Sequence, residues 1–332
     1  MLKSADVVAG LAWGDEGKGK ITSYLASSGK YNYVCRWAGG SNAGHTVYIN
    51  ENKYKTHVIP SGVFHGIPSI IGPSCVINKT SLYSELEYLH DNGFDIHLVK
   101  ISPRAHIVTD EHILLDRERL APALGTTGSG IAPAYADKAA RCGVRAEDYL
   151  PKSMIWDEKL EGNVLCEGAQ GVWLDLDWGN YPYVTSSTTL PYGACSLGIP
   201  PQKINRIYGV AKIYDTRSGT DPIFPESLLE DQILSRLADL GEEVGVTTGR
   251  RRKVQWLNLD KLIHSVNMTG TTDLIINKCD ILDKLGVYKI IYNGRVAQFN
   301  SLTDMIGFVK ARLSERCHLL KNKLFSSSPL TL

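Results

Sequence analysis

The sequence predicts an α/β protein in which a mainly parallel central sheet is flanked by helices. Short apolar runs alternate along the chain with longer segments of helical periodicity, which is typical of a parallel sheet with helices on both faces. Polar stretches rich in glycine and threonine follow several of these runs, where the ligand-binding loops of such sheets lie. No internal repeat and no proline- or serine-rich linker divides the chain, so we expect a single large domain over residues 1–332.

Each expected strand is a short apolar run bounded by glycine, proline or polar residues. In chain order these strands are Asp6–Ala9, Tyr33–Trp37, Ser69–Ile71, Val164–Glu167, Ile204–Ile213, Leu274–Asn277 and Lys289–Ile291. The expected helices are longer segments in which apolar residues recur with the period of an α-helix. They are Lys18–Ala26, Ser81–Asn92, Glu111–Leu120, Leu229–Leu240, Leu257–Thr269 and Leu302–Leu320.

The charge balance indicates that any anion is bound by local clusters and not by a global field. The chain has 36 basic and 35 acidic residues and a net charge of +1, so we expect neither nucleic acid nor a membrane as a partner. The seven cysteines include no C-x-x-C pair, which indicates the reduced thiols of a cytoplasmic protein and not a zinc site or disulfide framework. No apolar run approaches ~18 residues, so we expect no signal peptide and no membrane span.

A glycine-rich turn follows the first strand, in the segment Val7–Lys20 with the sequence V-V-A-G-L-A-W-G-D-E-G-K-G-K. Its glycines allow backbone N–H groups to surround an anion, which predicts a P-loop-like phosphate site. The match to a Walker A motif is poor, because six residues separate Gly10 from Gly17. In addition, Gly19 stands where that motif has the Ser or Thr that binds Mg²⁺.

Two acids lie inside this turn, which is unusual for a phosphate site. Asp15 and Glu16 would repel a phosphate unless Mg²⁺ offsets their charge or catalysis uses them. Lys18 keeps the expected place of a phosphate-binding lysine. We therefore expect a modified phosphate loop in which Asp15 has a separate task; the alternative is a tight turn with solvent-exposed acids.

Further polar loops follow later strands. His45 lies in G-G-S-N-A-G-H-T, where a general acid toward a phosphoryl or base oxygen is a better interpretation than a surface histidine. In G-T-T-G-S-G, Thr127 offers a hydroxyl and an amide to a phosphate. The glycine-flanked Gln170 has both donor and acceptor capacity, which suits a purine edge. Thr185 belongs to a hydroxyl-rich run that also suits a phosphate.

Two segments near the end of the chain carry charge. Val246–Lys253 reads V-T-T-G-R-R-R-K, which is compatible with a solvated basic face, a nucleic-acid patch or a carboxylate clamp. The absence of a wider basic field weakens the nucleic-acid interpretation, and bidentate arginine geometry favours a small acidic substrate. Asn277–Asp280 reads N-K-C-D directly after an apolar strand. The Asp280 carboxylate is suited to accept from guanine N1–H and N2–H₂, which adenine lacks.

Six motifs in one order carry a resemblance to a known family. W-G-D-E-G-K-G-K, N-A-G-H-T, G-T-T-G-x-G-x-x-P-A-Y, E-G-A-Q-G, Y-P-Y-V-T-S and T-T-G-R-R-R closely resemble adenylosuccinate synthetases, over residues 6 to about 282. The resemblance implies a ligase that joins the amine of L-aspartate to C6 of IMP, with GTP and Mg²⁺. The purine 6-oxygen is first phosphorylated because it is a poor leaving group, and the amine then displaces phosphate.

The resemblance also implies a role for each matching residue. Asp15 looks like the base that removes the purine N1 proton, and it shares Mg²⁺ with the Gly44 backbone. His45 looks like the acid that faces the GTP β/γ phosphates and the developing 6-oxyanion. The implied triphosphate-binding residues are Gly14, Glu16, Gly17, Lys18, Gly19, Thr46, Lys278 and Asp280. The implied monophosphate-binding residues are Asn42, Thr127, Arg141, Gln170, Thr185 and Arg250, with Arg141 donated across a homodimer, and the aspartate-binding residues are Thr247, Thr248, Arg250 and Arg252.

Departures from the family pattern concern the nucleotides. The short chain resembles the compact archaeal- and phage-type branch, which includes enzymes that make 2-aminoadenylosuccinate from dGMP and use ATP or dATP. Ser218 replaces a valine that lies by the ribose, Asp221 adds a charge nearby, and the segment Leu324–Leu332 lacks the usual S-T-G-P stretch. In the dGMP branch serine replaces the loop aspartate and the guanine reader is lost, whereas Asp15 and N-K-C-D are intact here. The sequence therefore favours IMP and GTP over dGMP with ATP, dATP or GTP.

A GTP-binding switch protein is an alternative from another functional class. Such a protein would use N-K-x-D and a phosphate loop to control partner binding, without small-molecule substrates. It would need a Ser or Thr as a Mg²⁺ ligand, and Gly19 does not supply one. The sequence therefore favours the ligase over the switch protein. A catalytically inactive family member that acts as a binding protein is a further alternative, which the presence of both Asp15 and His45 disfavours.

Overall fold

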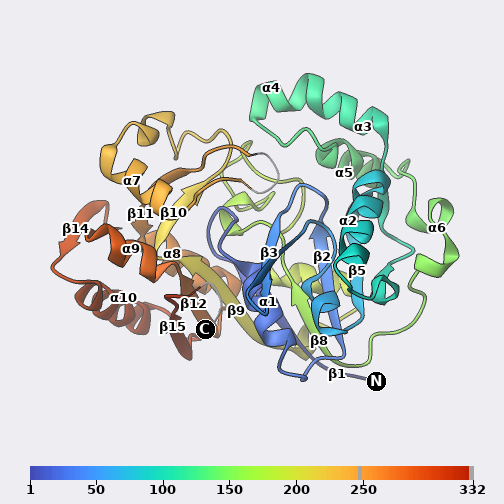
Figure 1. Ribbon diagram of the computed structural model, residues 1–332, viewed down its shortest axis with the longest axis horizontal. Helices are drawn as coiled ribbons and strands as arrows, with labels where there is room; N and C mark the ends of the chain where they lie inside the picture. The colour runs from blue at the N-terminus through green and yellow to red at the C-terminus, as the bar shows by residue number, and fades with distance from the viewer. Residues whose placement is uncertain (246–248, 329–332) are drawn as a thin grey trace.

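In the computed structural model, which describes residues 1–245 and 249–328, a nine-stranded sheet runs through the middle of the molecule (Figure 1). Within these residues the strand order is β15-β12-β9-β1-β8-β2-β5-β6, with β7 beside β5. Every neighbouring pair in this sheet is parallel, which confirms the predicted fold class. The strands are β1 (Leu2–Gly10), β2 (Tyr33–Gly39), β5 (Ser69–Asn78), β6 (Val99–Ile101), β7 (His106–Val108), β8 (Gly162–Glu167), β9 (Ile204–Lys212), β12 (Asp273–Asn277) and β15 (Asn322–Phe325).

Both faces of the central strands are buried, which explains why these strands are continuous apolar runs in the sequence. In β1, Val7 points to one face of the sheet and Val8 to the other, because successive side chains of a strand alternate. Helix α1 (Lys18–Ala26) covers the face of Val8 and packs Ile21 there. The opposite face is covered at this point by a 3₁₀ segment, Pro191–Leu197, and not by an α-helix.

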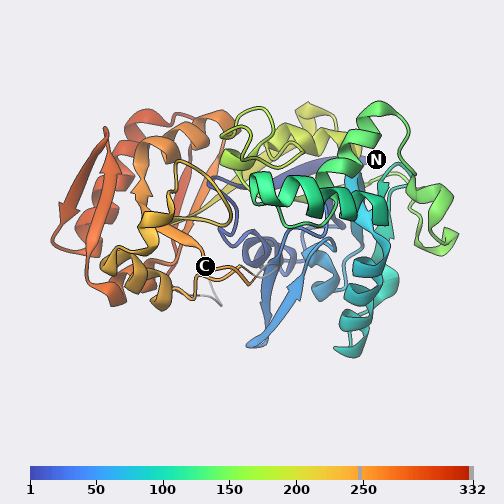
Figure 2. The same cartoon turned by 90° about the horizontal axis from the view of Figure 1, so that it is seen from above.

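A second sheet of four strands lies beside the carboxyl-terminal half of the main sheet. Its strands are β10 (Tyr214–Arg217), β11 (Lys253–Asn258), β13 (Tyr288–Tyr292) and β14 (Arg295–Phe299), in that order. The strand predicted at Lys289–Ile291 belongs to this smaller sheet. A hairpin of β3 (His45–Ile49) and β4 (Asn52–Thr56) extends away from the main sheet, as Figure 2 shows.

The helices are α1, α2 (Lys79–Asp91), α3 (Asp110–Leu115), α4 (Ala121–Leu124), α5 (Ile131–Ala140), α6 (Ala146–Tyr149), α7 (Gln232–Leu240), α8 (Leu259–Thr269), α9 (Cys279–Leu285) and α10 (Leu302–Arg316). The predicted bounds of α1 are confirmed at both ends. The helix predicted from Leu257 begins later, because Leu257 belongs to β11 and the Asn258 side chain caps α8 by accepting from Lys261 N. No helix in the described ranges is both long and apolar enough to cross a bilayer.

The helix predicted at Glu111–Leu120 is divided into α3 and a π-helical turn at Asp116–Leu120. The buried Asp116 carboxylate accepts hydrogen bonds from Thr126 Oγ1 (2.6 Å) and Gly130 N (2.8 Å). The extra residue in the turn directs this side chain toward the loop that precedes α5. The carboxylate therefore fixes the loop that contains Thr126 and Thr127, which both line a cavity at the edge of the sheet.

Candidate active site

The loops at the carboxyl ends of five adjacent strands, β12, β9, β1, β8 and β2, meet around one cavity of about 660 Å³. The loop after β1 contributes Asp15 and Lys18, and the loop after β2 contributes Asn42. Gln170 follows β8, and Lys212 ends β9. This is the edge at which parallel sheets bind ligands, since the strand ends leave their polar loops on the same side.

The turn after β1 closes around a carboxylate of its own. The Glu16 side chain is buried and accepts hydrogen bonds from Ala12 N (3.1 Å), Gly14 N (2.9 Å) and Lys18 Nζ (2.6 Å). Gly17 precedes α1 in the left-handed region with φ 94°, which a residue with a Cβ rarely adopts. The Glu16 carboxylate therefore holds the fold of the turn, and its predicted contact with a triphosphate stays a prediction.

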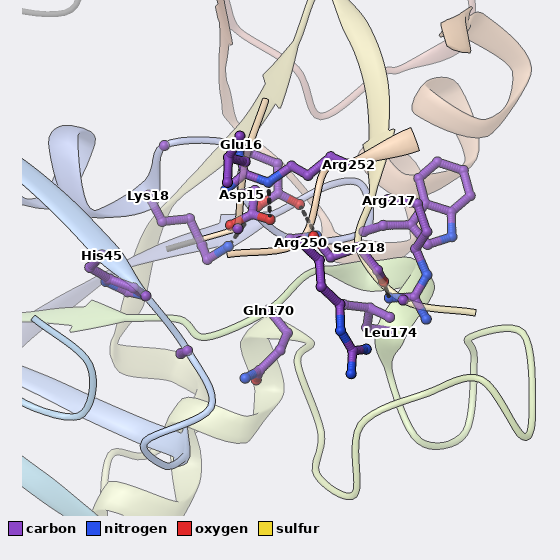
Figure 3. Close-up of a pocket in the computed structure, with 18 of the residues that line it drawn as sticks. Asp15, Glu16, Lys18, His45, Gln170, Leu174, Arg217, Ser218, Arg250 and Arg252 are labelled. Carbon is purple, nitrogen blue, oxygen red and sulfur yellow. Dashed lines mark hydrogen bonds and ion pairs between the residues drawn. The ribbon is translucent and has the colours of Figure 1, made fainter. Parts of the chain in front are cut away.

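Asp15 points the other way, into the cavity. Its backbone is left-handed (φ 61°), which is uncommon for a non-glycine residue and marks a locally constrained turn. The carboxylate forms an ion pair with Arg252 Nε (2.8 Å) and stays 26% exposed. Figure 3 shows Asp15 between Lys18 and His45 on one side of the cavity and Arg217 on the other. The side chains of the two neighbouring acids thus point in different directions and have different partners.

His45 stands beside a buried ion pair at the end of β8. Its Nδ1 contacts Glu167 Oε1, and Glu167 also accepts from Arg36 Nη2 (3.0 Å) and Ser61 N (2.7 Å). Burial, followed by the nearby Arg36 guanidinium, lowers the pKa of His45 to about 4. Burial opposes ionisation of Glu167, but the charges of His45 and Arg36 outweigh it and lower its pKa to about 2. At neutral pH the ring is neutral, with its proton on Nδ1 toward the carboxylate, and Nε2 is the nitrogen left for a ligand.

Unpartnered polar atoms mark another part of the cavity. Both the oxygen and the nitrogen of the Gln170 side chain are buried and have no hydrogen-bond partner among the described residues. The Ser218 hydroxyl is in the same situation, and both residues line the cavity. Buried polar groups are normally satisfied, so these atoms indicate where a ligand supplies donors and acceptors. Arg250 reaches the same region and donates from Nη1 to Gly125 O (3.1 Å).

The loop after β12 contributes a further part of the cavity lining. Asn277 Nδ2 donates to Glu16 O (2.8 Å), which joins the N-K-C-D segment to the glycine-rich turn. Lys278 is left-handed (φ 68°) and donates to Gly241 O (2.9 Å), and Asp280 lines the cavity. Lys20 donates to Ser326 Oγ (3.0 Å) and so holds the end of the described chain beside this loop. Burial lowers the pKa of Lys20 to about 8.

Comparison with known proteins now identifies the family. The model of the family described as adenylosuccinate synthetase matches residues 7–163 and 151–298. The adenylosuccinate synthetase of Geobacillus sp. (strain WCH70) is 38% identical over 89% of this chain and 82% of its own. That of Streptococcus sanguinis (strain SK36) is 39% identical over 86% of this chain and 79% of its own. The chain belongs to the adenylosuccinate synthetase family. It is thus a member of a family of C–N ligases that use GTP as a co-substrate, as the motifs predicted.

Solved structures agree with this assignment. The fully ligated adenylosuccinate synthetase of Plasmodium falciparum has a TM-score of 0.83 and 26% identity, and the match covers 98% of both chains. The succinoaminodeoxyadenylate synthetase of cyanophage S-2L, solved with dGMP and dATP as an energy donor, has a TM-score of 0.74 over 99% of this chain and 94% of its own. At 20% identity, the phage enzyme shows a shared fold only.

Most residues predicted for this adenylosuccinate synthetase site lie around the one cavity. Those that line it are Gly14, Asp15, Glu16, Gly17, Lys18, Gly19, Asn42, Gly44, His45, Thr46, Thr127, Gln170, Thr185, Arg250, Arg252, Lys278 and Asp280. Thr247 and Thr248 lie outside the described residues. Arg141 instead lines a second, basic cavity of about 430 Å³, with Arg104, His106, Lys138 and Arg145.

Sequence reasoning missed several basic groups in the cavity wall. Lys20, Lys212 and Arg217 all line the cavity but were not predicted. In the sequence, Lys212 could have been identified only as a charged residue at the end of an apolar strand. Asp221, expected to add a charge nearby, does not itself line the cavity: its buried carboxylate accepts from Asn180 Nδ2 (2.7 Å) and pairs with Nε (3.3 Å) of the wall residue Arg217.

We predict that His45 titrates near pH 4 in the ligand-free protein and that Glu167→Gln lowers this pKa further. The pKa of His45 should fall because the negative charge of Glu167 favours the protonated ring, whereas burial and the positive charge of Arg36 oppose protonation. NMR titration of the imidazole C–H signals, assigned with a His45→Gln variant, measures the shift. Glu147→Gln, which removes an exposed carboxylate outside the cavity lining, is the control. A raised His45 pKa in Glu167→Gln would contradict the prediction.

We also predict that Gly171→Ala disrupts the glycine-rich turn. A Cβ at this position would overlap with Glu16 Oε1 and Ala12 O, although the extended backbone (φ −154°) suits alanine. We expect a loss of about 1–3 kcal/mol in the free energy of unfolding and weaker triphosphate binding, measured by urea denaturation and calorimetry. Gly307→Ala in α10 meets nothing within 4 Å and should stabilise by about 0.5–1 kcal/mol. If the two variants changed the free energy of unfolding equally, the overlap at Gly171 could not be the cause of the change.

Proposed function

We propose that the protein joins L-aspartate to C6 of IMP at the expense of GTP, and yields adenylosuccinate, GDP and phosphate. The observation that carries this proposal is that one cavity brings Asp15, Lys18 and His45 together with two sets of recognition residues. One set includes Gln170 and Arg250, which suit a purine monophosphate. The other set is the N-K-C-D loop, whose Asp280 carboxylate suits the guanine of GTP.

The first step is phosphoryl transfer to the purine. Asp15 removes the N1 proton, and the 6-oxygen of IMP bonds to the γ-phosphorus of GTP while the bond to the β-phosphate oxygen breaks, which releases GDP. Lys18 offsets the charge of the transferring phosphoryl group. His45 faces this group through Nε2, and the negative charge of the phosphates raises its pKa toward the donating, protonated form. The buried Glu167 carboxylate orients the ring in both protonation states.

The second step forms the C–N bond. The amine of L-aspartate bonds to C6, the C6–O bond breaks, phosphate leaves with the oxygen, and the amine nitrogen loses a proton. Arg252 and Arg250 line the cavity, and their guanidinium groups suit the aspartate carboxylates. Thr247 and Thr248, which the family resemblance also assigns to aspartate, lie outside the described residues.

Mg²⁺ belongs to the proposal through the family resemblance, and the chain's donors suit it. Mg²⁺ in nucleotide sites is typically held by one or two carboxylates, substrate phosphates and water. The partly exposed Asp15 carboxylate and the backbone of Gly44, which lines the same cavity, match that pattern. No cluster of three His, Cys, Asp or Glu side chains suited to a metal occurs in the described residues. Bound Mg²⁺ would neutralise phosphate charge and offset that of Asp15.

A homodimer is part of the proposal, with residues 1–332 as one functional unit in each subunit. Arg141 lines the second cavity and not the first, so it has no place at the monophosphate end of its own subunit. Its left-handed backbone (φ 66°) ends helix α5 at the rim of that second cavity. This location supports donation of the Arg141 guanidinium to the neighbouring subunit.

A dGMP-dependent enzyme that uses ATP or dATP is the second candidate. This candidate rests on the departure at Ser218, which stands where the family pattern has a valine by the ribose and whose hydroxyl has no hydrogen-bond partner among the described residues. The Asp15 carboxylate and the Asp280 carboxylate, both at the cavity, favour IMP and GTP.

We predict that Asp15→Asn lowers kcat by at least about 10²-fold, because the amide cannot accept the N1 proton. Phosphate release should require IMP, GTP, L-aspartate and Mg²⁺ together in the unmodified protein. IMP affinity, measured by calorimetry, should change little in the variant. Asp177→Asn, an exposed aspartate outside the cavity lining, is the matched control. Full-rate phosphate release without aspartate or IMP would refute the ligase.

A competition assay decides the nucleotides. We expect purified protein supplied with equal IMP and dGMP, together with GTP, L-aspartate and Mg²⁺, to form the succinylated inosine product, identified by mass. Replacing GTP by ATP or dATP as the sole triphosphate should give less product. Predominant succinylation of dGMP would establish the second candidate instead.

A further inference from the structure

Glu243 lies behind the cavity wall and is outside every set of site residues predicted above. It follows α7, where its backbone N–H donates to Ala238 O (2.9 Å), and the residue is 1% exposed. Its carboxylate accepts from Lys212 Nζ (2.8 Å and 2.9 Å), Tyr214 OH (2.8 Å) and Arg252 Nη1 (2.7 Å). Glu243 O also accepts from Arg252 N (2.9 Å). Main chain and side chain together fix Arg252.

The charges of this cluster are balanced in pairs. Lys212 and Arg252 are the cations, and Glu243 and Asp15 are the anions, since Arg252 Nε also pairs with Asp15 (2.8 Å). Lys212 and Arg252 are both almost fully buried but still line the cavity. Burying a cation without a partner is costly, so Glu243 is what allows two positive groups to stay at this wall.

The direction of Arg252 depends on this pairing. A free arginine side chain has many rotamers, whereas here Nη1 donates a hydrogen bond to Glu243 (2.7 Å) and Nε lies 2.8 Å from an Asp15 oxygen in an ion pair. The guanidinium thus lies between two carboxylates, one behind the wall and one at its surface, and the hydrogen bond to the one behind the wall sets its direction. Without the Glu243 carboxylate, Arg252 and Lys212 would both be attracted to Asp15, and the Arg252 guanidinium would change its position.

We propose that Glu243 is a positioning residue for the aspartate half of the reaction. It holds the Arg252 guanidinium at the angle needed to receive a carboxylate of L-aspartate, and it keeps Lys212 from competing for Asp15. The inference rests on the proposed function, in which Arg252 binds aspartate. Glu243 acts through Arg252 and Lys212 and touches no substrate.

Glu243→Gln is the direct test, because it keeps the shape and removes the charge. The amide NH₂ would face N–H donors, so the variant loses one acceptor and leaves a cation unpaired. We expect the KM for L-aspartate to rise about tenfold or more. The KM values for IMP and GTP should change less than about twofold, because Lys18 has its own carboxylate partner, Glu16.

Asp6→Asn is the matched control. Asp6 is an equally buried carboxylate (1% exposed) that accepts from Tyr31 OH (2.7 Å) and pairs with Lys30 Nζ (2.5 Å), outside the cavity lining. Asp6→Asn should lower the urea midpoint as Glu243→Gln does but leave all three KM values unchanged. A merely structural role of Glu243 would make the two variants kinetically alike.

Each outcome decides the proposal. A wild-type KM for L-aspartate in folded Glu243→Gln, or an equal rise for all three substrates, would overturn it. If Glu243→Gln does not fold, Glu243→Asp keeps the charge but shortens its reach, and the same selective rise in the KM for L-aspartate is expected. Failure of the proposed function can be told apart from failure of the Glu243 proposal, because in the first case the unmodified protein itself would show no aspartate-dependent phosphate release.

Discussion

The pairing of buried carboxylates with basic side chains determines the shape of the cavity. Three of the buried glutamates stand at or behind strand ends, and their pairs are Glu16 with Lys18, Glu167 with Arg36 and Glu243 with Lys212 and Arg252. A buried carboxylate is costly unless it is paired and hydrogen-bonded, so each glutamate requires its cation to stay in place. The wall thus carries oriented positive groups before any ligand enters, as preorganised electrostatic catalysis requires.

The glycine-rich turn shows how this constraint separates two neighbouring acids. Glu16 turns inward and takes the backbone N–H groups of Ala12 and Gly14, which in an ordinary phosphate loop would face the anion. Asp15 turns outward because its left-handed backbone reverses the chain at that point. An arriving phosphate must therefore share Lys18 with Glu16. In the proposed function the turn serves both as a phosphate site and as the carrier of a reactive carboxylate.

Much of the fold and of the cavity lining was predictable because the signals are local. The apolar runs at Val164–Glu167 and Leu274–Asn277 are buried on both faces, so their sequences identify them as strands of a parallel sheet. The second sheet was not foreseen. Its strand β11 ends in Asn258, which also caps α8, and a pattern of apolar residues runs on across that boundary without a break.

By itself the sequence determined the parallel sheet, the glycine-rich turn after its first strand and the family to which the chain belongs. Each of these depends on neighbouring residues or on motifs in fixed order. Only the tertiary structure decided that Asp15 meets Arg252, that His45 meets Glu167 and that Glu243 holds Lys212. The partners are far apart in the chain, and an isolated charged residue carries no periodic signal. Burial explains these pairs, because a charged group that leaves water is costly unless an opposite charge lies beside it. The fold brings such partners together where the strands end.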